Sequence, residues 1–584
     1  MKKNKLYTAV ILSVLLFTNN ACTEVTDYDD GRISYEEIFQ NDQKTAAYLN
    51  LCYSAVDFYG MQYGNSTLLA GFTDEAHDAN DAVNGSAYTW YKGRVTAYSN
   101  PINNGWWEQY WAGIRYCNIF LSNIDNATLS LERNRAGWRA QAHILRAYYY
   151  LQLIKRYGGV PVITEPSPIH FDYSKIKKTT FTTTARQILA DCDEALQVSD
   201  SDLGWRAGNA ESDRGKVTKA MAYAIKSETA LYAASPLWND GSFTWSEAAQ
   251  ITQEALNACL NHGYELYSQA PAGNAGYMPY DVYFYSRSDV NGATDKETIF
   301  ESKSQMPVFM YNGLPIVNGM IKCGDCPSQE LVDAYETTDG VAPILGYSDD
   351  EHLHPIINPE ATLYNEADPY ANRDPRLKAS IYYNGALFNL GDGNSRVWTY
   401  EGGNCERSTT SMMHTRTGYY LRKYSNFNSD KNSNKDGYFK MFRLAELYLN
   451  AAEALNEASN GTAPQEAINA INAIRSRVGM PGVPQNMSQA DFRKKVRNER
   501  RVELAFEEHR FYDVRRWKIL SETDKVITGM SCQNNNGSFT YQRFVVDKDR
   551  KAYTDKYLIM PIPGDEAIRL KENTGVNYQN PRWE

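Results

Sequence analysis

The sequence predicts a mainly α-helical protein in which paired helices form a scaffold and an irregular, loop-rich segment forms a second lobe. Three observations lead to this fold class. Long segments repeat apolar residues at helical spacing, these segments have the length of helical hairpins, and residues 262–438 lose the period and become rich in Gly, Asn, Pro and Tyr. With 584 residues, 42% of them hydrophobic, the chain can bury a large core.

The first 21 residues have the layout of a secretory signal. Three lysines precede an apolar run, and the small residue Ala21 stands before Cys22. The run is too short to cross a bilayer, and no other stretch approaches the roughly 18 apolar residues that a spanning helix needs. We predict a signal peptide over residues 1–21 and a mature protein that is not an integral membrane protein.

Cys22 stands at what resembles a bacterial lipoprotein cleavage site, although Asn19 takes a place where such sites usually carry Leu. We predict lipidation of Cys22; the alternative is ordinary cleavage and a free thiol. Residues 22–40 then form an acidic tether, beginning TEVTDYDDG after the cysteine. Removing the three signal lysines from a formal net charge of −10 leaves −13, which argues against nucleic acid and anionic lipid as partners.

Residues 41–261 are predicted to form the first part of the helical scaffold. An amphipathic helix over 44–59 is followed by a long aperiodic insertion near 60–104, whose length favours a functional role. Apolar spacing predicts five further helices in this part, which cover residues 106–125, 132–157, 183–198, 215–234 and 246–261.

The irregular lobe is predicted over 262–438, with short strand-like runs such as ETIFESKS, LKASIYYNG and YYLRKY. Residues 439–584 return to the scaffold. They contain predicted helices over 440–458 and 464–478, then a helix that Ser488 and Asp491 open with a capping-box pattern. Residues 528–543 are predicted to be a polar loop.

Residues 497–517, RNERRVELAFEEHRFYDVRRW, combine an apolar stripe with dense charge and are predicted to be one helix. Two interpretations fit. The carboxylates and arginines form an ion-pair network that fixes helix packing, or a carboxylate pair works with His509 as acid and base. We favour the network, because no glycine-rich loop, metal-spaced cluster or nucleophile motif lies nearby.

The cysteines give little sign of a metal or redox site. Cys323 and Cys326 form a CxxC motif without a second CxxC or a nearby His, so a small disulfide loop or two free thiols is expected. The four cysteines that fall inside predicted helices are expected to be core residues: Cys52, Cys117, Cys192 and Cys259.

The helix pairs resemble a divergent tetratricopeptide array, in which stacked units bury faces that no single pair could bury. Several phrases in order also resemble the SusD/RagB family of Bacteroidetes nutrient-binding lipoproteins. They are Cys22 with its context, AHILRAYYYLQLIKRYGGVPVI (142–163), GKVTKAMAYAIKSETALYAA (215–234), FRLAELYLNAAEALNE (442–457), the charged stretch 497–517, LIMPIPGDE (558–566) and YQNP (578–581).

The resemblance implies a scaffold of four tetratricopeptide-like units and a binding protein without catalytic activity. It also implies a lipid anchor in the outer membrane, facing the outside of the cell, and a SusC-like TonB-dependent transporter as partner. The implied role is to capture an oligo- or polysaccharide and deliver it to that transporter. A peptide-binding member of the family is the alternative; neither a metal nor a cofactor is implied.

Residue usage supports a carbohydrate ligand independently, because 13% of residues are aromatic and many of these lie in predicted loops. Sugar C–H faces pack on aromatic rings, while hydroxyl groups pair with polar side chains. Trp90 ranks first, since no period predicts its burial. The further candidates are Tyr88, Tyr91, Asp78, Arg94, Tyr283, Tyr311 and Trp398. Trp106, Trp107 and Trp111 are assigned to helix packing.

A secreted glycoside hydrolase is the least favoured alternative. Such an enzyme needs two carboxyl groups that flank the scissile bond, and the sequence identifies no such pair. His352 and His354 stand in a polar loop, where solvated histidines are common. We therefore expect a binding protein and not an enzyme.

Overall fold

The structure is a computed structural model. It describes residues 34–56, 67–80, 85–103, 105–168, 171–207, 213–269, 276–285, 294–389 and 395–584. The predicted signal peptide, Cys22 and most of the predicted tether lie outside the described residues, so the structure does not bear on those three predictions.

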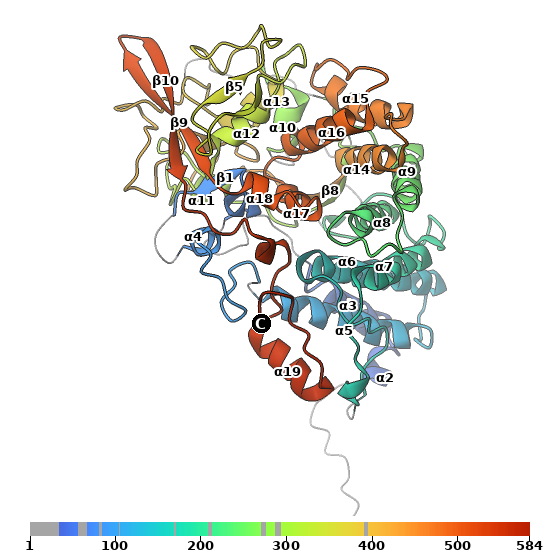
Figure 1. Ribbon diagram of the computed structural model, residues 1–584. Helices are drawn as coiled ribbons and strands as arrows, with labels where there is room; N and C mark the ends of the chain where they lie inside the picture. Colours follow the sequence, from blue (N-terminus) through green and yellow to red (C-terminus); the bar gives the residue numbers. More distant parts are fainter. Residues whose placement is uncertain are drawn as a thin grey trace, which may run out of the picture.

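Helices that stack in chain order form the N-terminal part of the scaffold (Figure 1). α5 packs on α6, α6 on α7, α7 on α8, and α8 on α9. The bounds are α2 Tyr35–Ile38, α3 Asp42–Cys52, α5 Trp106–Ile124, α6 Glu132–Tyr157, α7 Phe181–Leu196, α8 Lys219–Ala234 and α9 Trp245–Asn261. The helical fold and the stacking of successive helices are confirmed.

The C-terminal helices extend this stack. α14 packs against α8, α9, α15 and α16, so residues far apart in sequence share one array. The bounds are α14 Leu444–Ala458, α15 Gln465–Arg477, α16 Gln489–Glu503, α17 His509–Arg516, α18 Leu520–Thr523 and α19 Gly564–Thr574. α19 lies at the opposite end of the molecule from α15 (Figure 1).

Side-chain caps explain several of the helix starts. Asn41, Thr180, Thr218, Thr244 and Ser488 each accept a hydrogen bond from a backbone N–H in the first turn of the helix that follows. The first amphipathic helix is shorter than predicted, because α3 ends at Cys52 and the chain then turns.

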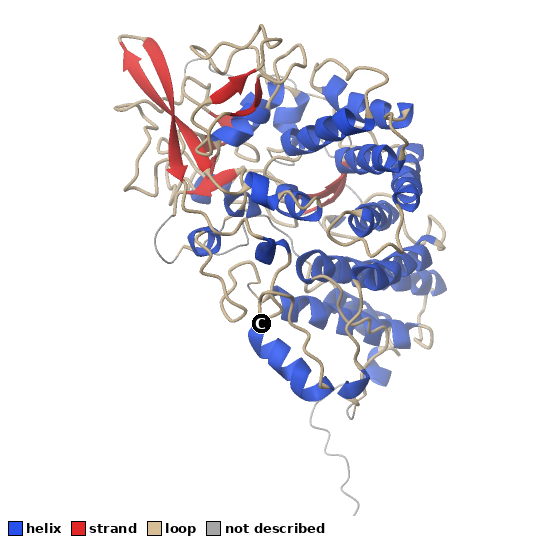
Figure 2. Cartoon of the chain, in the orientation of Figure 1, coloured by secondary structure: helices blue, strands red, loops and turns tan. Residues whose placement is uncertain are grey.

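The loop-rich lobe carries most of the strands (Figure 2). They form two-stranded antiparallel sheets, β1 with β3, β2 with β8, β4 with β5, β6 with β7, and β9 with β10. The strands before residue 450 are β1 Ala76–Asp78, β2 Thr298–Glu301, β3 Asp325–Pro327, β4 Ile344–Tyr347, β5 Pro355–Ile357, β6 Ile381–Tyr382, β7 Tyr420–Leu421 and β8 Lys440–Arg443. The short helices are α4 Ser86–Tyr91, α10 Pro279–Tyr283, α11 Val308–Tyr311, α12 Gln329–Ala334 and α13 Pro375–Ser380.

The predicted polar loop at 528–543 is wrong. The structure has a hairpin there, β9 Ile527–Asn535 and β10 Ser538–Asp547, which projects at the upper left of Figure 1. Asn536 and Gly537 adopt positive φ, 55° and 93°, as the two central residues of a tight hairpin turn require. The Asn-Gly pair was the sequence signal for this turn.

The predicted single helix over 497–517 is also wrong. α16 ends at Glu503 and α17 begins at His509, and between them Phe506 and Glu508 have φ of 62° and 67°. Positive φ is unfavourable for bulky residues, so surrounding contacts must hold this turn. Those contacts belong to the ion-pair network described below.

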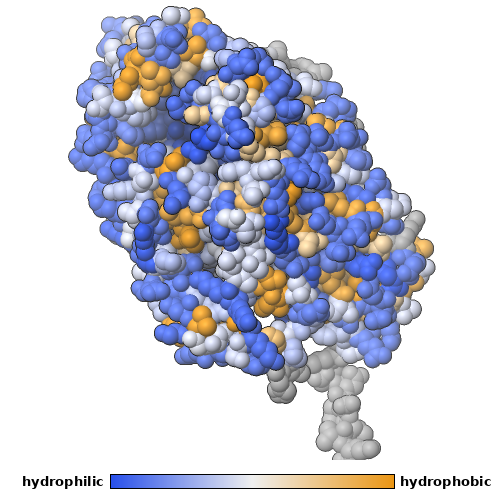
Figure 3. All heavy atoms as spheres, turned by 45° about the vertical axis from the view of Figure 1, so that its right-hand side comes forward, coloured by the Kyte–Doolittle hydropathy of each residue, from blue (hydrophilic) through white to orange (hydrophobic). Residues whose placement is uncertain are grey.

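The scaffold and the lobe have separate buried cores. The largest core follows the stacked helices, and a second lies beneath the lobe, around residues such as Tyr280, Phe284 and Tyr424. On the face shown in Figure 3, hydrophobic residues form separate patches among hydrophilic ones. Within the described ranges, no helix has both the length and the hydropathy to cross a membrane.

Candidate functional site

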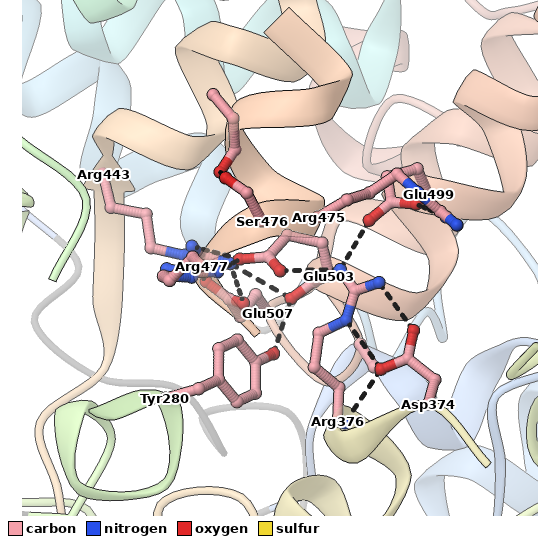
Figure 4. A network of polar contacts seen from close by, with 12 residues as sticks. Tyr280, Asp374, Arg376, Arg443, Arg475, Ser476, Arg477, Glu499, Glu503 and Glu507 are labelled. Carbon is pink, nitrogen blue, oxygen red and sulfur yellow. Dashed lines mark hydrogen bonds and ion pairs between the residues drawn. The ribbon is translucent and has the colours of Figure 1, made fainter. Parts of the chain in front are cut away.

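A buried ion-pair network joins the scaffold to the lobe and occupies the turn between α16 and α17 (Figure 4). The Glu503 carboxylate accepts hydrogen bonds from Arg376 at 3.0 Å, from Arg443 at 2.7 Å and from Arg477. Glu507 accepts from Arg443 and Lys423, both at 2.7 Å. The positive φ values on either side of Glu507 therefore accompany the insertion of that carboxylate into the network.

The surrounding guanidiniums favour the charged form of these carboxylates. Burial opposes ionisation of Glu503, but the guanidiniums of Arg477, Arg443 and Arg376 hold its pKa well below the usual range. The Asp513 pKa is likewise lowered, against the effect of burial, by Arg500 and Arg516. Each carboxylate is thus committed to several arginines.

His509 does not have the environment of an acid and base. Burial and the positive charge of Arg500 lower its pKa to about 4, so the ring is neutral at pH 7. The nearest carboxylate oxygen that pairs with it belongs to Glu446, at 3.9 Å. This arrangement agrees with the structural interpretation of residues 497–517.

Trp90 does not stand free in a loop as expected. It lies on α4, has no exposed surface, and packs against the rings of Phe72, Phe511 and Tyr557. The guanidinium of Arg515 lies 5.5 Å from its ring centroid. A helix of six residues is too short to show an apolar period, so periodicity does not reveal this burial.

Three more predicted ligand contacts are buried: Tyr91, Asp78 and Tyr283. Asp78 bonds to Thr67 and Lys322, and the Tyr283 hydroxyl bonds to Thr298 at 2.8 Å. None of the three offers a surface to a ligand. Their role as ligand contacts stays a prediction, which their burial does not favour.

Tyr88, Arg94 and Tyr311 lie nearer to solvent. Tyr88 is half-buried on α4, Arg94 is exposed with its guanidinium 5.0 Å from the Tyr88 ring centroid, and Tyr311 is half-buried at the end of α11. They do not form one cluster with the remaining candidate, Trp398.

Trp398 lies in a group of half-buried rings on the lobe. Its ring stacks on Phe539 with centroids 5.5 Å apart and an interplanar angle of 25°, and Tyr400 lies 5.9 Å from it. Tyr400 and Phe539 are 5.8 Å apart. The three half-buried rings of Trp398, Tyr400 and Phe539 are called the aromatic platform here.

Local hydrogen bonds fix the two loop rings of the platform. The Asn404 side chain accepts a hydrogen bond from the backbone N–H of Trp398 at 2.9 Å and donates one to the Arg396 carbonyl. The backbone N–H of Cys405 donates to the Trp398 carbonyl. Gly403 lies so close to the Trp398 carbonyl that a Cβ would be 2.4 Å from its oxygen. The loop is therefore a closed turn that presents the indole.

The hairpin supplies the third ring and extends the row. Phe539 and Tyr541 alternate on one face of β10, and Tyr541 meets Tyr370 edge-on at 5.5 Å. Tyr370 stacks on Tyr383 at 4.3 Å. All three added rings are half-buried. The lobe therefore carries two groups of three half-buried rings, which are related through the positions of Phe539 and Tyr541 on one face of β10.

The chemistry of this row suits a flat, weakly polar ligand face. The exposed parts of these half-buried rings offer a surface on which the C–H face of a ligand can stack. Contacts between the rings fix their orientation before a ligand arrives. Exposed Arg396, held by a 2.6 Å hydrogen bond to the Gly385 carbonyl, adds donors beside Trp398. The sequence analysis named Trp398 but neither Tyr400 nor Phe539, and Phe539 reaches the platform only through the hairpin.

In the described ranges, the cysteines are buried thiols, and no cluster of side chains is suited to bind a metal ion. Cys323 and Cys326 are buried thiols with Sγ atoms 3.3 Å apart, and Cys52, Cys117, Cys192 and Cys259 are core residues as predicted. Among the residues that the structure describes, no group of three His, Cys, Asp or Glu side chains could hold a metal ion.

Comparison with known proteins shows similarity along the whole chain. A sequence model described as the SusD family matches residues 283–583, and a model described as starch-binding, associating with the outer membrane, matches residues 30–207. SusD-like protein P2 of Formosa agariphila is 23% identical over 600 residues and covers 100% of both chains.

Solved structures show the same fold. A SusD-like protein from Bacteroides fragilis is 26% identical with a TM-score of 0.73, covering 93% of this chain and 98% of the other. A surface glycan-binding protein A from Bacteroides fluxus is 19% identical with a TM-score of 0.58, covering 93% and 99%. The chain belongs to the SusD family, and the model that matches its N-terminal part is described as starch-binding and associating with the outer membrane.

Proposed function

We propose that the protein binds an oligo- or polysaccharide on the aromatic platform and delivers it to a SusC-like TonB-dependent transporter. The observation that carries the proposal is the contact among Trp398, Tyr400 and Phe539, three half-buried rings from two separate chain segments. Apolar rings exposed together on a water-facing surface have a cost unless they meet a ligand. Family membership supports a saccharide as that ligand.

The continuation of the row through Tyr541, Tyr370 and Tyr383 supports an extended ligand. A saccharide chain could place successive ring faces on successive aromatic side chains. A single sugar would use only part of this surface. We therefore infer that the ligand is a chain of several sugar units rather than a monosaccharide.

Affinity electrophoresis with immobilised polysaccharides tests the platform. The wild-type protein should be retarded by at least one glycan of a panel, and Trp398→Ala should lose most of the retardation. Tyr35→Ala is the matched control, because Tyr35 is a 48% exposed ring on α2, outside the lobe. Equal retardation of all three proteins would refute the platform. Binding to peptides alone would replace the saccharide by the peptide alternative.

Lipidation of Cys22 and outward orientation complete the proposal. They rest on the layout of the first 31 residues and on the resemblance to lipoproteins of this family. Labelling with a clickable palmitate analogue should mark the wild-type protein and not Cys22→Ser, and antibodies should label intact cells. Copurification with an outer-membrane transporter in mild detergent tests the partner; repeated failure to copurify would contradict it.

The proposal is binding without catalysis. Glu503, Glu507 and Asp513 are buried and paired with arginine or lysine side chains, so they are poorly suited to exchange protons with a glycosidic oxygen. Incubation of the purified protein with each bound glycan should release no reducing sugar. Release of reducing ends by a homogeneous preparation would contradict the proposal.

A further inference from the structure

Two cysteine side chains lie in contact inside the lobe. Cys326 lies on β3, Cys323 stands three positions before it, and neither residue has exposed surface. Their Sγ atoms are 3.3 Å apart. The sulfurs of a disulfide are about 2.05 Å apart, so a movement of about 1.2 Å brings the two atoms to bonding distance. Small rotations of the two side chains supply a movement of this size.

The backbone between the two cysteines forms a tight turn. Gly324 has a φ of 61°, and a Cβ at this position would lie 2.1 Å from the carbonyl oxygen of Tyr311. The Gly324 carbonyl accepts a hydrogen bond from the backbone N–H of Ala79 at 2.7 Å. The backbone N–H of Cys323 donates to the Met412 carbonyl at 3.0 Å. Segments that are distant in sequence therefore hold the turn, so the contact between the sulfurs belongs to the folded lobe.

The two thiols differ in acidity. Burial raises the pKa of the Cys323 thiol well above its usual range. Burial also opposes ionisation of Cys326, but hydrogen bonds from the Cys323 thiol and from the backbone N–H of Arg416, the latter at 3.4 Å, lower its pKa. The thiolate is the nucleophile in thiol–disulfide exchange, so Cys326 is the better attacking sulfur of the pair.

The surroundings favour a disulfide over a metal site. A structural zinc ion needs four protein ligands, and within the described ranges no group of three His, Cys, Asp or Glu side chains is suited to hold a metal. The layout of residues 1–21 predicts export from the cytoplasm. Disulfides form and persist in oxidising compartments outside the cytoplasm.

We propose that Cys323 and Cys326 form a disulfide in the exported protein. The oxidant is the disulfide of a thiol oxidase in the cell envelope. Because neither cysteine has exposed surface, the exchange takes place before the lobe is fully packed. The sequence left a disulfide loop and two free thiols as alternatives, and the contact between the sulfurs decides for the disulfide.

The exchange has two steps. The Cys326 thiolate attacks one sulfur of the oxidase disulfide, which forms a mixed disulfide and releases the other oxidase sulfur as a thiolate. The Cys323 thiolate then attacks the Cys326 sulfur, which forms the new bond and releases the second oxidase thiolate. The two protons that leave the cysteines pass to the two oxidase thiolates. The pair thus loses two electrons, and the oxidase disulfide is reduced to a dithiol.

The bond acts locally in the core of the lobe. Cys323 and Cys326 belong to a buried cluster that also contains Val397 and Cys405. Val397 precedes Trp398 in the chain, and the Cys405 N–H donates to the Trp398 carbonyl. A ring that closes so few residues removes little chain entropy, so its effect is to fix the turn within this cluster. The inference does not depend on saccharide binding.

Sequential alkylation tests the disulfide on the full protein from its own cells, which are quenched in acid before lysis to prevent later oxidation. Iodoacetamide in denaturant blocks free thiols, dithiothreitol reduces disulfides, and N-ethylmaleimide labels the thiols that reduction releases. Trypsin cuts after Lys322 and Arg373, so Cys323 and Cys326 are the only cysteines of one peptide. Both should carry N-ethylmaleimide. Without reduction, this peptide should be about 2 Da lighter than its dithiol form, because two hydrogens are lost.

Cys192 is the matched control, because it is a buried core thiol of α7 and the only cysteine of tryptic peptide 187–206. It should carry iodoacetamide. In the Cys326→Ser variant, Cys323 should carry iodoacetamide as well. Iodoacetamide on both Cys323 and Cys326 of the wild-type protein would overturn the inference. A peptide in which either cysteine is linked to Cys405 would overturn the assigned pairing.

Discussion

The ion-pair network and the aromatic platform differ in the way that a structural site and a binding site should. The network holds full charges, yet Glu503 and Arg443 are almost completely buried and every charge has a partner. The platform carries no charge, yet its three rings keep part of their surface exposed and pack against one another. The most charged segment is therefore scaffold, and an uncharged surface row is the candidate site.

The contrast shows why charge density alone misleads. Buried charges need several partners each, which fixes the geometry and removes freedom to react. Aromatic rings on a surface need no charged partner to keep their geometry, because contacts with neighbouring rings hold them in place. The two regions differ in whether a ligand can reach their side chains, and the density of charge does not indicate this.

The largest expected effect is on the network. Glu503→Gln leaves Arg376, Arg443 and Arg477 without their common carboxylate, so the free energy of unfolding should fall by about 3–5 kcal/mol, as for one lost partner of a buried ion pair. Urea denaturation measures it. Glu572→Gln, at an exposed position, is the control and should change stability by less than about 0.5 kcal/mol.

If the Glu503→Gln protein is as stable as the control variant, the network does not stabilise the scaffold. If the variant does not fold at 37 °C, it is expressed at a lower temperature, and its midpoint of thermal unfolding is measured in cell lysate. A folded variant that has lost glycan binding but no stability would contradict the separation of scaffold and site.

The next effect concerns the platform. Phe539→Ala should weaken saccharide binding about tenfold, because a lost stacking contact of about 1.4 kcal/mol corresponds to that factor. Phe539→Tyr should retain binding. Isothermal titration with the strongest glycan of the panel gives both affinities, and equal affinities for Phe539→Ala and wild type would exclude Phe539 from the site.

A smaller effect concerns His509 and pH. Its folded pKa of about 4 lies below the ordinary value of about 6.5, so the unfolded chain binds a proton more readily between these values. Stability from the neutral ring is complete above pH 6.5 and is lost as the pH falls toward 4. His509→Gln should flatten the stability profile in that window; an unchanged slope would contradict the assigned environment.

The smallest expected effect completes the comparison. Trp398 and Phe539 carry no ionisable group, so the part of the saccharide affinity that comes from their rings should stay constant with pH and depend little on salt. Titrations at pH 6, 7 and 8 and at two salt concentrations measure this. A steep salt dependence would point to Arg396 rather than the rings.

Sequence periodicity predicted much of the scaffold. The helix over 132–157 was located to the residue, because 26 residues of sustained period end at Gly158, whose φ is 77°. The helix over 497–517 and the loop over 528–543 failed for a different reason. The helix is interrupted because partners distant in sequence hold Glu507, and the loop is a hairpin because Asn536 and Gly537 form its turn.

The candidate site was harder to predict than the fold. Trp398 could be named because it stands in an aperiodic segment, but the same argument named Trp90, which is fully buried. Aperiodic sequence carries no information on exposure, because tertiary contacts decide which rings of a loop turn inward. Phe511 and Tyr557, hundreds of residues away, cover Trp90.

The sequence by itself determined the helical scaffold, the core cysteines and the family to which the chain belongs, because apolar spacing and ordered local phrases are properties of neighbouring residues. Only the tertiary structure decided which aromatic residues remain at the surface. Trp398 meets Phe539 across 141 positions of the chain because the hairpin folds back onto the lobe. Exposure is a property of contacts between distant segments, and local sequence does not encode it.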